Sequence, residues 1–108
     1  MRNKTKLKLV GEYIFLKKID NFCKNLTPEF DFFKEKTKRL INIYKKIFFK
    51  FGFFDLSFAV LQKELCEGNM IRFDFEKLRQ RLDEIETEVF VFVKKCRLNE
   101  FEKRYIVE

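Results

Sequence analysis

The sequence predicts an all-α protein, a compact antiparallel bundle of about four helices in a single domain covering residues 1–108. Apolar residues recur at helical spacing over two long stretches, and capping signals bound most of the helical segments. Hydrophobic residues make up 46% of the chain, so a core can form without disulfides. Short connections between the segments favour antiparallel neighbours. The alternative is an α+β fold with short strands near 4–10, 70–73 and 89–93.

The first predicted helix covers residues 5–24, with Thr5 as its cap. Its apolar residues point to several sides, which indicates a helix covered by more than one neighbour. Gly11 lowers the helix propensity, and lysines alternate with other residues before Leu9, which also fits a strand. Helix is therefore expected mainly from Leu9 onward. The basic residues before it either form a flexible arm or fray in solvent: Arg2, Lys4, Lys6 and Lys8.

The second helix has clearer boundaries. Thr27, Pro28 and Glu29 supply a capping oxygen, a first-turn proline and an early carboxylate in the preferred order. Gly52 is a natural C-terminal stop. Between them one face carries a stripe of apolar residues: Phe30, Phe33, Leu40, Tyr44, Ile47 and Phe51. This pattern predicts an amphipathic helix of about six turns over 28–51.

The C-terminal half begins with a shorter predicted helix, capped by Asp55 and ended by Gly68. Asp74 then precedes the strongest periodic segment of the chain, and Asn99 is expected to cap a terminal helical piece. Spacings of three and four residues over 75–96 predict a seam resembling a coiled coil. The seam consists of Phe75, Leu78, Leu82, Ile85, Val89, Phe92 and Cys96.

The composition excludes several kinds of chemistry. Histidine is absent, which removes imidazole bases and imidazole metal ligands, and three glycines are too few for a phosphate-binding loop. Cys23, Cys66 and Cys96 form no CxxC pair, as expected for thiols in a reducing cytoplasm. No stretch of 18 residues lacks charge, so no membrane span is expected. The sequence thus predicts a non-enzymatic cytoplasmic protein with no cofactor and no metal site.

The charge is unevenly distributed along the chain. Residues 1–54 carry a net charge of +9, whereas residues 55–108 carry −2. A basic half of this strength attracts polyanions, which makes nucleic acid, either DNA or RNA, the predicted partner. On the helix 28–51, basic residues and aromatic rings lie away from the apolar stripe, where rings can stack on bases. The predicted binding residues are Lys34, Lys38, Arg39, Lys45, Lys46, Phe49 and Lys50, with Phe32 as a further ring.

An adaptor or assembly subunit is the alternative function. Six phenylalanines lie within residues 48–58, more than one corner of a small bundle can bury. Exposed apolar patches usually mark interfaces with a partner or with a second copy. In this hypothesis Phe53, Phe54 and Phe58 form the contact surface, together with the 75–96 seam, while the lysines only maintain solubility.

Overall fold

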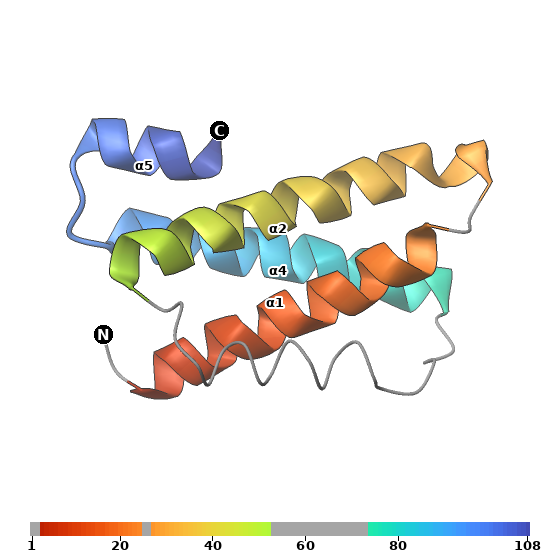
Figure 1. Cartoon of the computed structure of the whole chain (residues 1–108), viewed down its shortest axis with the longest axis horizontal. Coiled ribbons are helices and arrows are strands. Elements are labelled where there is room, and N and C mark those ends of the chain that lie inside the picture. Colours follow the sequence, from red (N-terminus) through yellow and green to blue (C-terminus); the bar gives the residue numbers. More distant parts are fainter. Residues whose placement is uncertain (1–2, 25–26, 53–73) are drawn as a thin grey trace. The chain divides into compact units, whose positions relative to one another are not determined.

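The computed structural model describes residues 3–24, 27–52 and 74–108, and every regular element in these ranges is helical (Figure 1). The elements are α1 (Asn3–Cys23), a 3₁₀ turn η1 (Pro28–Phe30), α2 (Asp31–Phe51), α4 (Phe75–Lys95) and α5 (Glu100–Val107). The all-α prediction is confirmed. The chain divides into two compact units, Met1–Met70 and Ile71–Glu108, and the prediction of a single domain stays a prediction.

Two of the three strands of the alternative fold are wrong, because residues 4–10 and 89–93 are helical. In α1, the adjacent residues Leu9 and Val10 are both buried, which an alternating strand does not allow. In α4, Val89 and Val93 are buried while Val91 is 44% exposed. A strand would place all three valines on one face, so the period of this segment is helical. The third strand, 70–73, lies outside the described residues.

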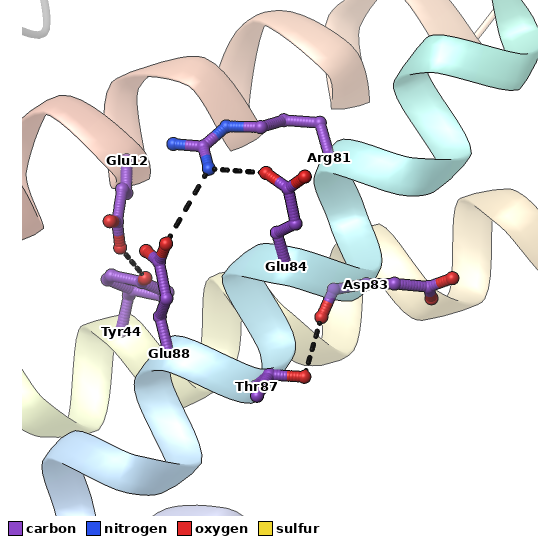
Figure 2. Close-up of polar contacts among 7 residues, drawn as sticks. All are labelled: Glu12, Tyr44, Arg81, Asp83, Glu84, Thr87 and Glu88. Atoms are coloured by element: carbon purple, nitrogen blue, oxygen red, sulfur yellow. Dashed lines mark hydrogen bonds and ion pairs between the residues drawn. The ribbon is translucent and has the colours of Figure 1, made fainter.

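The first unit contains an antiparallel hairpin of α1 and α2 (Figure 1). Its register follows from contacts between the two helices. The hydroxyl of Tyr44 donates a hydrogen bond to the Glu12 carboxylate (Figure 2), and the rings of Tyr13 and Phe48 meet edge to face at 5.2 Å. Because Glu12 is buried, this hydrogen bond offsets part of the cost of removing a carboxylate from water.

The boundaries of α2 differ from the prediction at one end only. Pro28–Phe30 forms the 3₁₀ turn, and α2 begins at Asp31. The Thr27 hydroxyl donates to Glu29 at 3.0 Å instead of capping a backbone N–H. At the other end Gly52 adopts the left-handed conformation at φ 70°, and its N–H donates to the Phe48 carbonyl. The predicted glycine stop is therefore confirmed.

The predicted stripe supplies half of the buried residues of α2. Four of its six members are buried, whereas Phe30 and Phe51 at the ends are half-buried. Leu40 is among the fully covered residues, and the buried face also includes positions outside the stripe. The buried residues of α2 are Phe33, Thr37, Leu40, Ile41, Ile43, Tyr44, Ile47 and Phe48.

In the second unit, α5 follows α4 and folds back along it (Figure 1). Asp74 caps α4 by accepting the Glu76 N–H at 3.0 Å, and Asn99 and Glu102 form a capping box on α5, so both predicted caps are confirmed. The buried residues of α4 are Leu78, Leu82, Ile85, Val89 and Val93. Val93 thus takes the place expected for Phe92, because a seven-residue pattern drifts by roughly 20° per heptad on a straight helix.

Candidate nucleic-acid interface

The solvent side of α2 is strongly basic. From Thr37 to Phe51 the helix contains five basic residues and no acidic residue. Lys38, Arg39, Lys45 and Lys50 are exposed, and Lys46 is half-buried. We call the exposed side chains of this stretch the basic face: Lys38, Arg39, Asn42, Lys45, Phe49 and Lys50. The structure therefore brings most of the predicted binding residues onto one side of one helix.

Phe49 is the aromatic member of the basic face. Its side chain is 82% exposed, whereas that of its neighbour Phe48 is fully buried and contacts Tyr13 and Tyr44 edge to face. The 100° rotation between consecutive helical residues separates the two rings. Lys45 and Lys46 precede Phe49 by four and three residues, so they are its neighbours on the helix surface. An accessible ring thus lies among cations.

Phe32 is exposed to nearly the same extent, at 79%, but its surroundings differ. Three exposed acidic residues lie within three positions of it along the chain: Glu29, Asp31 and Glu35. Lys34, one of the predicted binding residues, is half-buried and forms an ion pair with Asp31 at 3.8 Å. The start of α2 is therefore electrostatically mixed. Lys34 lies one turn before Lys38 on the same side of the helix, but Asp31 pairs with it, so it is not counted in the basic face.

The N-terminus of α1 adds charge at the same end of the hairpin. Because α1 and α2 are antiparallel, the first turns of α1 lie at the end where α2 finishes (Figure 1). Lys4 and Lys8 are exposed there, and Lys6 is half-buried. The expectation of a flexible arm is wrong for these lysines, since α1 begins at Asn3. The opposed dipoles of the two helix ends offset each other, so the lysines dominate the local potential.

The two cysteines in the described residues are poor candidates for nucleophiles. Desolvation raises the pKa of the buried Cys23 thiol, with a further increase from Asp20 and a smaller opposing effect from Lys34. Desolvation also raises the pKa of Cys96, opposed by Lys103. Both thiols are therefore held in the protonated form, whereas reactive cysteines have a lowered pKa.

Neither a metal site nor a membrane span is found in the described part of the chain. Within residues 3–24, 27–52 and 74–108, no three His, Cys, Asp or Glu side chains are grouped to hold a metal ion. None of the helices in these ranges is both long enough and apolar enough to cross a bilayer. Two acidic residues of α4 form ion pairs: Arg81 contacts Glu84 at 3.1 Å and Glu88 at 3.8 Å (Figure 2).

The α5 helix carries an exposed aromatic pair that the sequence analysis did not identify as a surface. Phe101 is 80% exposed and Tyr105 is 59% exposed, while the adjacent Ile106 is buried. Their spacing of four residues places both rings on one side of the helix, a signal that the sequence does contain. The predicted contact residues Phe53, Phe54 and Phe58 lie outside the described residues.

Comparison with known proteins adds no functional information. The chain matches no protein-family model, and no curated protein or solved structure is significantly similar to it.

Proposed function

We propose that this protein is a non-enzymatic, cytoplasmic nucleic-acid-binding protein, and that the basic face of α2 is its binding surface. The observation that carries the proposal is the exposure of Phe49 among lysines, on a stretch of 15 residues with no acidic side chain. The fold depends on the buried apolar residues of α2, whereas the exposed cations and the exposed Phe49 ring do not contribute to the core. Nucleic acid suits both features, because its phosphates attract the lysines and its bases can stack on the phenylalanine ring.

The four exposed cations of the basic face allow an estimate of the salt dependence. Each neutralised phosphate contributes a slope of about −0.7 to log K against log salt for single strands, and about −0.9 for duplexes. With about four phosphate contacts, raising the salt from about 50 to 200 mM lowers the affinity roughly 50-fold for a single strand and roughly 150-fold for a duplex. Fluorescence anisotropy with labelled single- and double-stranded DNA and RNA measures this slope. Absence of binding at low salt would exclude the proposal.

The cysteines support a reducing compartment. Cys23 and Cys96 are free thiols, and an odd, sparse set of cysteines is typical of chains that do not form disulfides. A cytoplasmic location agrees with access to DNA or RNA.

A protein–protein adaptor or assembly subunit is the second candidate, and the exposed pair Phe101 and Tyr105 supports it. Aromatic residues are the anchors most often found at the centre of interfaces. If the pair joins two copies of this chain, sedimentation will show a concentration-dependent dimer that is insensitive to salt. Serine at both positions would then give a monomer, whereas an unchanged monomer at all concentrations argues against self-association.

A further inference from the structure

We infer that the basic face of α2 selects single-stranded nucleic acid, with Phe49 as the side chain that stacks on an unpaired base. The inference rests on the proposed function and extends it to the class of nucleic acid. Phe49 lies in the last turn of α2, and because its side chain is 82% exposed, its ring is accessible for face-to-face contact. In a duplex the base faces are occupied by their stacked neighbours. Only an unpaired base can offer its face to this ring.

The charge pattern supports this occupant and locates the site along α2. Lys38 and Lys50 are twelve residues apart, a distance of about 18 Å along a helix. At about 3.4 Å per stacked nucleotide, this length matches roughly five phosphates of one strand. Lys4 and Lys8, both exposed in the first turns of α1, add positive charge at the end of the hairpin where α2 finishes. A short single strand is thus complementary to the basic face in both charge and length.

The two exposed rings of α2 are not equivalent, and this makes the inference specific. Phe49 has Lys45 and Lys46 as helical neighbours. Phe32 has one basic helical neighbour, Lys36, but three acidic residues lie within three positions of it: Glu29, Asp31 and Glu35. Phosphates flanking a base stacked on Phe32 would approach carboxylates, which opposes binding. We therefore assign the stacking role to Phe49 alone. Phe32 and the α5 residue Phe101 then serve as matched exposed phenylalanines without a role in binding.

The test compares three probes of equal length: a 12-nucleotide thymidine strand, the same sugar-phosphate strand without bases, and a 12-base-pair duplex. The strand with bases is expected to bind roughly 5- to 150-fold more tightly than the strand without them, the range that stacking of one base supplies. Phe49→Ala should remove this difference without changing affinity for the baseless strand. Phe32→Ala and Phe101→Ala should leave the preference intact. Alanine favours helix, so all three variants are expected to fold, which circular dichroism checks.

The possible failures are distinguishable. A purely electrostatic surface prefers the duplex, because the duplex carries more charge per unit length. If the duplex binds best, and the strands with and without bases bind equally in a salt-dependent manner, the single-strand inference is overturned while the proposed function stands. If Phe49→Ala and Phe101→Ala lower affinity equally, the stacking role of Phe49 is wrong. If none of the probes binds at low salt, the proposed function itself is excluded.

Discussion

The helices α2 and α4 have the same length, 21 residues, and each buries an apolar face, yet their solvent sides differ. In α2 seven basic and two acidic residues give a net charge of +5, whereas α4 has five of each. Arg81 on α4 is engaged by Glu84 and Glu88, and such exposed pairs contribute little to stability. The comparison shows that the core determines only the buried side of a helix. An unbalanced solvent side therefore carries information about binding.

The two helices also differ in the apolar residues that they expose to solvent. The α2 helix exposes two phenylalanines, Phe32 and Phe49, while the large hydrophobic residue that α4 exposes is Val91. Leaving a phenylalanine in water forgoes about 1.5–3 kcal/mol of burial free energy. At Phe49 this free energy is forgone beside a row of cations, and a ring among cations is the combination that suits stacked bases.

Charge reversal should give the largest effect and tests the contrast directly. Lys38→Glu with Lys45→Glu is expected to weaken nucleic-acid binding on the order of 100-fold at about 50 mM salt, because two phosphate contacts are lost and two repulsions appear. The matched control is Lys77→Glu with Arg79→Glu on α4, both exposed, which changes the net charge by the same amount. Equal losses in the two double variants, measured by anisotropy, would show that only net charge matters.

Tyr44→Phe should produce the largest change in stability among conservative substitutions of these helices. The Tyr44 hydroxyl donates to the buried Glu12 carboxylate, and losing a donor to a buried charged group costs about 1–3 kcal/mol. In α4 the Thr87 hydroxyl donates to the Asp83 carbonyl at 3.0 Å, but Thr87 is exposed. Thr87→Val should therefore change the unfolding free energy by less than about 0.5 kcal/mol. Urea unfolding of both variants decides whether burial accounts for the difference.

The reactivity of one cysteine in each unit, Cys23 in the first and Cys96 in the second, can be compared. Because burial raises the pKa of both Cys23 and Cys96, each should react with iodoacetamide more slowly than free cysteine at pH 8, and the buried Cys23 at least about tenfold more slowly. The thiol pKa is higher in the folded state than its ordinary value near 8.5 in the unfolded state. The associated stability is complete below the unfolded-state pKa and is lost as the pH rises through the folded-state pKa. Unfolding free energy should thus fall at alkaline pH. Mass spectrometry of the labelled peptides measures each rate, and rapid labelling of Cys23 would contradict its burial.

Small effects of opposite sign are expected at the two described glycines. Gly11 is helical, and a methyl group there meets no atom within 4 Å, so Gly11→Ala should stabilise the protein by up to about 1 kcal/mol. Gly52 has φ 70°, a conformation that alanine adopts with strain, and Gly52→Ala should destabilise by about 1 kcal/mol. Opposite shifts in thermal midpoint are the expected result. Shifts of the same sign would contradict the described ends of α2 or the helix at Gly11.

Much of the fold was predictable because its signals are local. Hydrophobic spacing predicted half of the buried residues of α2 and most of those of α4, and the residues Gly52, Asp74 and Asn99 act at helix ends as their chemistry predicts. The N-terminal lysines were harder to assign. Their alternation fits a strand, and the burial of Leu9 and Val10 that stabilises the helix there depends on tertiary packing.

The candidate site was predictable in composition but not in geometry. Helical periodicity placed Lys38, Lys45 and Phe49 on the solvent side of α2, and the structure agrees. The same periodicity could not show that Lys34 pairs with Asp31, because that depends on rotamers. Nor could it determine whether a second helix covers Phe32 and Phe49, since neighbouring elements decide exposure.

The most direct test of the central claim is a map of where nucleic acid contacts the protein. Titration of isotopically labelled protein with a 12-nucleotide thymidine strand, followed by amide chemical shifts, gives this map. The account predicts that the largest shifts fall between Lys38 and Gly52, accompanied by the first turns of α1 and weakened by added salt. Shifts concentrated on α4 and α5, around Phe101 and Tyr105, with α2 unaffected would contradict it.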